Sequence, residues 1–457
     1  MKEVIQNLIT LVDSFVFSDI LKNPPKPYNE DKVNIISELE KLIDNKNKPF
    51  YEFYRDIKLT LSKTRDANLD ILGEQVPLSK GIYNFEDYRM CLPFRFYLDY
   101  NDKKETKIYI KEYEFCSQYY DKTVIETINK YKNISLEKIN DTDAFEYIHN
   151  FSQEFYNLKN RDNQFFIMMD SIPDNTLVFQ PLTYQQLNYM KLKFNNSEEF
   201  ETHFHLLKKK VEQSNDIKEE IKAEQINWNI SSPNGEMKCR VDETNKLNVI
   251  FFKSFYVEKE EDSLIYQCAD IFYSNDYRIL IITSLIWEGN NDNAIKYTQT
   301  LFPKLDVQIN LAMKQTQLNK DKYDLDTSIY LDPRTCLPYK SWNDFIEKDV
   351  DTYGEGIIHN RTKIYSPISQ TKVKKYSELR EKLIKKGHLK KATDILIMTD
   401  TVNNGAASLF IKTIQSNGGA IIASYGGNPK LDKSKLEQLD ASLDPVYNSQ
   451  YEKTNEF

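Results

Sequence analysis

The sequence predicts a multidomain α/β protein of the α+β kind, and three observations lead to this fold class. The chain has 457 residues, more than one hydrophobic core ordinarily serves. Hydrophobic residues make up 40% of it, with 30 Tyr and 25 Phe, so it can bury a substantial core. Strand-like and helix-like segments also alternate in the second half, as is typical of a parallel sheet covered by helices.

Charge and hydropathy exclude several partner classes. Lys and Arg number 61 against 69 Asp and Glu, a net charge of −8, with both signs spread along the chain, so we expect no nucleic-acid partner. No apolar run reaches the roughly 18 residues that a membrane span needs, so we expect none. The first 20 residues fit an amphipathic helix better than a signal peptide, which favours the cytoplasm but leaves the compartment open. Nothing in the sequence indicates an oligomeric state.

The cysteines are few, odd in number and widely spaced, so they predict buried thiols rather than a disulfide framework or a CxxC site. They are Cys91, Cys116, Cys239, Cys268 and Cys336. Glycosylation sequons do not decide the compartment, because an Asn-rich chain contains several by chance. They include the sequons that begin at Asn133, Asn140, Asn195, Asn229 and Asn360.

We expect no metal and no cofactor. His203 and His205 lie in a segment that looks helical, where a spacing of two places them on different faces. Asp324 and Asp326 begin like a calcium loop but lack its central Gly and distal Glu. The GxSxG, GxxxxGK, HExxH and GxGxxG motifs are all absent from the sequence.

Residues 1–80 are expected to form a helical N-terminal unit, broken by the stretch Pro24 to Pro27. Apolar residues recur there at helical spacing. Residues 81–225 are expected to form a compact β-plus-helix insert, because two alternating runs flank an Asn101-Asp102 turn. A short strand, a polar turn at Asn140-Asp141 and a helix follow these runs.

Residues 226–440 are expected to form an α/β core, and residues 441–457 a polar tail. The runs Leu247–Val257 and Arg278–Ile286 are nearly continuous apolar strands. Ile395–Asp400 is a buried strand, followed by a turn, a helix that ends near Gly418, and another strand. The basic run from Lys372 to Lys391 is interpreted as a solvated helix face.

Several of these segments, in this order, resemble the tail-specific (C-terminal-processing) serine peptidases, especially their divergent eukaryotic branch related to the chlamydial protease-like factor. The segments are VFSDILKNPPKPYNEDKVNIISEL (16–39), TRDANLDILG (64–73), SLEKINDTDAFEYI (135–148) and ILIMTDTVNNGAASLFIKTIQSNGGAIIASYGGNP (395–429). The resemblance implies that the insert is PDZ-like and that the core is a crotonase-like ββα tail-specific protease core.

The resemblance also indicates that the catalytic residues are lost. The family's nucleophilic serine falls on Gly405, and its histidine, which would accept the serine proton, falls on Asn68. Neither residue can replace the one lost. The oxyanion region of the family corresponds to Ala406, at the start of the helix, and to Gly289, the remaining glycine of a Gly-rich turn.

We therefore expect a pseudopeptidase that binds unfolded or extended polypeptide in the groove between the PDZ-like insert and the core. The alternative is an active serine-type peptidase that uses Ser408 with Lys430, or another serine. Against the Ser408–Lys430 pair, Ser408 lies a helical turn beyond Gly405 and is rotated away from it. A structural protein that has lost the groove is a third possibility.

Overall fold

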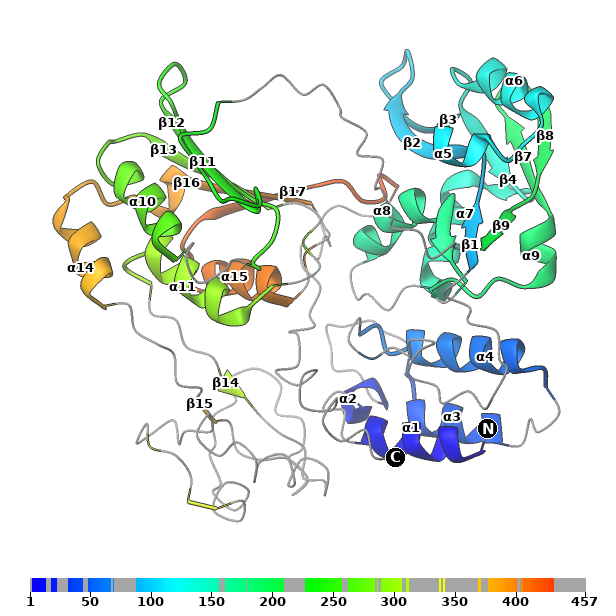
Figure 1. Cartoon of the computed structure of the whole chain (residues 1–457), viewed down its shortest axis with the longest axis horizontal. Helices are drawn as coiled ribbons and strands as arrows, with labels where there is room; N and C mark the ends of the chain where they lie inside the picture. Colours follow the sequence, from blue (N-terminus) through cyan, green and yellow to red (C-terminus); the bar gives the residue numbers. More distant parts are fainter. Residues whose placement is uncertain are drawn as a thin grey trace.

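The computed structural model describes residues 2–13, 18–22, 32–43, 48–66, 69, 88–155, 161–177, 179–208, 227–256, 262–283, 286, 289–305, 310–311, 337, 340–341, 369–370, 377–400, 403 and 405–430. The expected mixed α/β, multidomain α+β class is confirmed: helices and several separate sheets alternate along the chain (Figure 1). Among these residues, no helix combines the length and the apolar character needed to cross a membrane.

The N-terminal region is helical, as predicted. It contains α1 (Lys2–Asp13), α2 (Ser18–Lys22), α3 (Ile35–Ile43) and α4 (Phe50–Ser62). Buried apolar side chains recur at one or two helical turns on α1, α3 and α4, which is why the sequence forms amphipathic helices that pack on one another. Ile5, Val12, Ile35 and Leu39 belong to this small core.

The insert is built on a five-strand path, β2-β3-β4-β7-β8, and a small sheet, β6-β1-β9. The predicted hairpin is present: Asn101 Oδ1 accepts hydrogen bonds from the backbone N–H groups of Lys103 and Glu105 and so closes the turn. The insert strands are β1 (Tyr88–Cys91), β2 (Phe94–Tyr100), β3 (Thr106–Glu112), β4 (Leu136–Ile139), β5 (Thr142–Asp143), β6 (Asp174–Thr176), β7 (Met190–Phe194), β8 (Glu199–Thr202) and β9 (His205–Lys208). Its helices are α5 (Glu114–Ser117), α6 (Lys122–Tyr131), α7 (Ala144–Phe155), α8 (Arg161–Ser171) and α9 (Tyr184–Asn188).

The helix expected around His203 and His205 is wrong, because residues 190–208 form strands β7, β8 and β9. In β7 the buried Met190, Leu192 and Phe194 alternate with lysines, a period of two that fits a half-buried strand. The expected turn at Asn140-Asp141 is present, and both residues adopt a positive φ, of 47° and 66°.

The core sheet has the order β10-β11-β12-β13-β16-β17, and β12, β13, β16 and β17 run parallel. Its strands are β10 (Ile230–Ser231), β11 (Met237–Asp242), β12 (Leu247–Phe252), β13 (Arg278–Thr283), β16 (Ile395–Asp400) and β17 (Ile421–Tyr425). Its helices are α10 (Asp262–Phe272), α11 (Asn291–Leu301), α14 (Ser377–Lys385) and α15 (Gly405–Ser416). Short pieces complete the described chain: β14 (Asn310–Leu311), β15 (Ser369–Gln370) and the 3-10 turn Ala392–Asp394.

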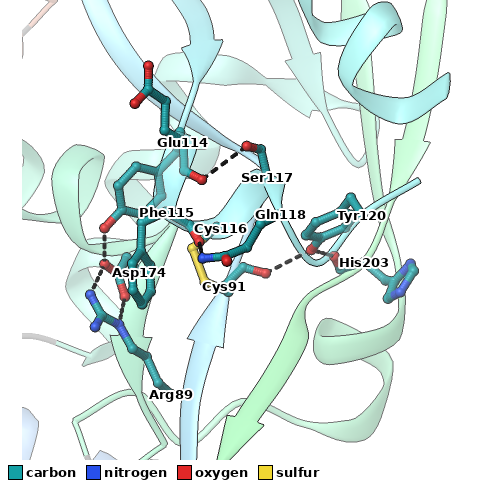
Figure 2. Close-up of a disulfide and its surroundings, with 11 residues drawn as sticks. Arg89, Cys91, Glu114, Phe115, Cys116, Ser117, Gln118, Tyr120, Asp174 and His203 are labelled. Atoms are coloured by element: carbon teal, nitrogen blue, oxygen red, sulfur yellow. Dashed lines mark hydrogen bonds and ion pairs between the residues drawn. A yellow bond between two sulfur atoms is a disulfide. The ribbon is translucent and has the colours of Figure 1, made fainter. Parts of the chain in front are cut away.

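The prediction of buried thiols is wrong for four of the five cysteines. Cys91 pairs with Cys116 across a Cα–Cα distance of 5.5 Å, and Cys239 pairs with Cys268 across 6.2 Å. The first disulfide joins the end of β1 to α5, and Tyr120 beside it donates a hydrogen bond to the backbone oxygen of Cys91 (2.8 Å, Figure 2). Separations of 25 and 29 residues gave no sign of these contacts, since tertiary folding creates them. Cys336 lies outside the described residues.

Candidate functional site

The carboxyl ends of three parallel core strands converge beside the start of α15. Two isolated parallel bridges extend the sheet past its regular strands, Phe255 with Gly289 and Ile286 with Asn403. The chain after β12 is thereby joined to the chain after β13, and the latter to the chain after β16. Ligands of open α/β sheets bind at this edge, beyond the carboxyl ends of the strands.

Gly405 is the first residue of α15 and has a φ of 51°. This is the left-handed region, which glycine enters at no steric cost. Two residues before it, the fully buried Asn403 is tied to the end of β16, because its Nδ2 donates to the backbone oxygen of Asp400 (2.9 Å) and to Thr399 Oγ1. Gly405 thus stands where a buried helix begins, shortly after the buried end of β16.

Gly289 and Ala406, the two residues assigned to the oxyanion region, are brought together. A methyl group on Gly289 would lie 3.0 Å from Ala406 Cβ and only 2.5 Å from Phe255 Cβ, so glycine is required for this approach. Ala406 lies in the first turn of α15, where backbone N–H groups lack helical partners and can hold an oxyanion.

Two buried polar atoms near this edge were not anticipated from the sequence. Thr283 Oγ1, at the end of β13, and Asn403 Oδ1 have no hydrogen-bond partner among the described residues, although both residues are 0% exposed. Thr283 is in register with Thr399, whose hydroxyl meets Asn403 Nδ2. The only sequence signal was the position of Asn403, two residues before the glycine of a strand-to-helix turn. Such unsatisfied groups usually indicate an ordered water or a ligand.

Ser408 and Lys430, the alternative pair, are placed differently. Ser408 is fully buried within α15. The Lys430 ammonium lies 3.0 Å from Asp143 Oδ1 of the insert and 4.5 Å from the centre of the Phe145 ring. This ion pair competes with any role of Lys430 as a base, because a proton acceptor must be neutral. Asn68 lies outside the described residues.

The described residues contain no group of three or more His, Cys, Asp and Glu side chains suited to a metal ion. The His203 and His205 rings are 5.0 Å apart and both contact Tyr120. Burial, followed by repulsion from His203, lowers the pKa of His205. Asp324 and Asp326 lie outside the described residues.

β17 is the last strand of the core sheet, and no other described strand pairs with its outer edge. Ile421 is 52% exposed and Tyr425 is 41% exposed, at the two ends of the strand. Figure 1 shows that the chain after β17 runs from the core to the insert near α8. There, a Cβ on Gly426 would lie 3.2 Å from the Phe166 ring. This edge, to which no described strand pairs, therefore continues into the segment that connects the two regions.

No family model matches the sequence, and no curated protein matches it. Among solved structures, a point mutant of CPAF aligns with a TM-score of 0.52 and 10% identity, over 92% of this chain and 82% of that one. Mature CPAF aligns at 0.46 and 11% identity, over 92% and 83%. The photosystem II D1 C-terminal processing protease aligns at 0.32 and 6% identity, over 93% and 82%. The first of these comparisons supports the tail-specific protease fold that the sequence predicts.

Proposed function

We propose that this protein is a catalytically inactive relative of the tail-specific serine peptidases that binds extended polypeptide between the PDZ-like insert and the core. The observation that carries the proposal is Gly405, which occupies the strand-to-helix turn beside Gly289 and Ala406. Catalytic serines on such turns are held in strained backbone geometry. Gly405 keeps a positive φ but has no side-chain oxygen to attack a peptide bond.

Binding does not need the lost residues. A polypeptide that adds a strand to a free sheet edge requires backbone donors and acceptors and a few contacts for its side chains. No described strand pairs with the outer edge of β17, and Ile421 and Tyr425 offer exposed apolar surface at its ends. The Lys430–Asp143 pair then ties the end of this segment to the insert. These features support a binding groove that includes β17.

The chemical half of the proposal is tested with a fluorophosphonate probe and unfolded casein. We expect the wild-type protein to remain unlabelled and to leave casein intact, and the double variant Gly405→Ser, Asn68→His to become labelled. If the wild-type protein is labelled and Ser408→Ala is not, the protein is instead an active serine-type peptidase that uses Ser408. Gly405→Ala is the matched control, because it introduces a Cβ at the same positive φ without an oxygen.

The binding half is tested by the fluorescence anisotropy of labelled, reduced and carboxymethylated casein. Successive amides along a strand point in opposite directions, so one of Ala423 and Ser424 directs its N–H away from β16. Proline at that residue should abolish binding while preserving the melting temperature, because proline is tolerated only where no ladder hydrogen bond is lost. Tyr425→Ala should weaken binding, whereas Tyr184→Ala should not, since Tyr184 is 83% exposed but lies on α9. Equal binding by the proline variant, Tyr425→Ala and the wild type would refute the groove.

A further inference from the structure

We propose that Asn133, Asn150 and Asn229 are attachment sites for N-linked glycans, and that the protein therefore matures in an oxidising secretory compartment. Each asparagine begins an Asn-x-Ser sequon, which is the acceptor motif for this modification. The inference is independent of the proposed peptide binding, since it rests on other residues.

The compartment is indicated by the two disulfides. Cys91, Cys116, Cys239 and Cys268 are all 0% exposed, so each bond lies inside a core. Disulfides of this structural kind form and persist in oxidising compartments and are rare where thiols are kept reduced. A chain that acquires them passes through the environment in which sequons are also modified.

Each of the three asparagines is exposed, and the side-chain Nδ2 of each has no hydrogen-bond partner among the described residues. Asn133 lies in the turn after α6, and Asn150 lies on the exposed face of α7. Asn229 precedes β10, and its Oδ1 accepts a hydrogen bond from the backbone N–H of Val241 at 2.7 Å. A glycan attaches to Nδ2, so this bond to Oδ1 can persist in the modified protein.

The asparagines of two other sequons make hydrogen bonds within the fold, and we expect them to carry no glycan. Asn140 is half-buried with a φ of 47°, and its Oδ1 accepts from the backbone N–H of Lys191 at 2.8 Å. Its own backbone N–H donates to Lys191 O at 2.8 Å, so the whole residue holds the turn against β7. Asn195 uses Nδ2 itself to donate to Ser135 Oγ. A glycan at either residue would compete with these contacts.

The modification is a glycosyl transfer from a polyprenyl-diphosphate-linked oligosaccharide. The bond between Asn Nδ2 and the anomeric carbon forms as the bond between that carbon and the diphosphate oxygen breaks. The diphosphate leaves with the electron pair, and the amide nitrogen loses one proton to the transferase. Both the donor and the transferase come from the secretory compartment.

The test uses full-length protein purified from its own cells, with free thiols blocked at lysis. Peptide N-glycosidase F in heavy-oxygen water converts each occupied asparagine to labelled aspartate, which mass spectrometry assigns to its position. We expect label at Asn133, Asn150 and Asn229, none at Asn140 or Asn195, and no blocked thiol at the four paired cysteines.

Two variants act as matched controls. Asn133→Gln should remove one glycan without changing the disulfides, whereas Asn140→Gln should remove none and should lower the melting temperature. The proposal is overturned if Asn133 is unlabelled, if Asn140 is labelled as fully as Asn133, or if the paired cysteines are recovered as free thiols. An unlabelled Asn150 or Asn229 would refute the assignment of that residue.

Discussion

The ammonium of Lys430 lies 3.0 Å from Asp143 Oδ1, although 287 positions separate the two residues along the chain. Asp143 immediately precedes α7, and the same carboxylate oxygen accepts the backbone N–H of Phe145 at 3.0 Å and of Glu146 at 3.2 Å. One carboxylate therefore caps a helix of the insert and holds the loop that follows β17 of the core.

We predict that the two roles of Asp143 can be separated by substitution. Lys430→Met and Asp143→Asn should each cost less than about 1 kcal/mol, because the ion pair is half-exposed and asparagine remains a good helix cap. Asp143→Ala should cost about 1 kcal/mol more than Asp143→Asn, since it also removes the cap. Unfolding in denaturant measures all three variants. Equal effects of Asp143→Asn and Asp143→Ala would contradict the capping role.

Loss of either disulfide should destabilise the protein substantially. The paired cysteines are 25 and 29 positions apart, so closing each loop is worth about 3.5 kcal/mol in the chain-entropy account. We expect the double variants Cys91→Ala, Cys116→Ala and Cys239→Ala, Cys268→Ala each to lower the free energy of unfolding by about 2–4 kcal/mol.

The measurement for both disulfide variants is denaturant unfolding with and without a reductant. Reduction should destabilise the wild type more than either variant, which retains one bond. A wild type that is insensitive to reductant, under conditions that demonstrably break both bonds, would contradict the prediction.

Gly289→Ala should be destabilising because the new methyl group would lie 2.5 Å from Phe255 Cβ. Overpacking of this kind costs about 1–3 kcal/mol, and it should also shift the start of α15. Gly387→Ala is the control, since a Cβ there meets nothing within 4 Å and only its positive φ of 83° is unfavourable. The loss of stability in each variant is measured by thermal and chemical unfolding. The difference between the two losses separates the cost of crowding from the cost of the backbone conformation. If Gly289→Ala lost less free energy of unfolding than Gly387→Ala, the close contact between Gly289 and Phe255 would be contradicted.

Acid should destabilise the insert through His205. Burial lowers the pKa of this histidine, and His203 lowers it further, while Asp121 acts in the opposite direction. The unfolded chain therefore binds the proton more tightly than the folded protein. The stability that neutral His205 contributes is complete above the unfolded pKa of about 6.5 and is lost as the pH falls below it.

The check is the free energy of unfolding measured between about pH 7 and about pH 5. His205→Gln should lose less stability over this interval than the wild type. His203→Gln should have the same effect to a smaller extent, because it removes only the neighbouring charge. A steeper loss in either variant would reverse the sign that we assign to His205.

Much of the fold could be predicted because its strands carry clear local patterns. The boundaries of β16, Ile395–Asp400, were expected exactly, since a β-branched apolar run ends there at a polar turn. Strands β7 and β8, before His203, were missed because charged residues alternate with apolar ones over only four or five positions, which a helical pattern imitates. Short segments of this kind take their conformation from their neighbours in the sheet.

The candidate site was only partly predictable for a similar reason. The approach of Gly289 to Ala406 followed from the family resemblance, which supplied the tertiary neighbourhood. The disulfides and the contact of Lys430 with Asp143 depend on residues that are distant in sequence. Local patterning contains no information about such pairs.

The order of the strands in the core sheet affects how the chain folds during synthesis. Ile279 of β13 pairs with Ile395 of β16, so the centre of the sheet cannot form until the ribosome has made more than a hundred further residues. Non-local parallel pairing of this kind is slow and leaves strand edges open in the meantime. The strands of the insert pair only with one another, and all of them precede the core in the sequence, so the insert can fold first. Until β16 has been made, the apolar strand β13 has β12 on one side and no partner on the side of β16, which makes this interval the time when the nascent chain is most exposed to aggregation and to chaperones.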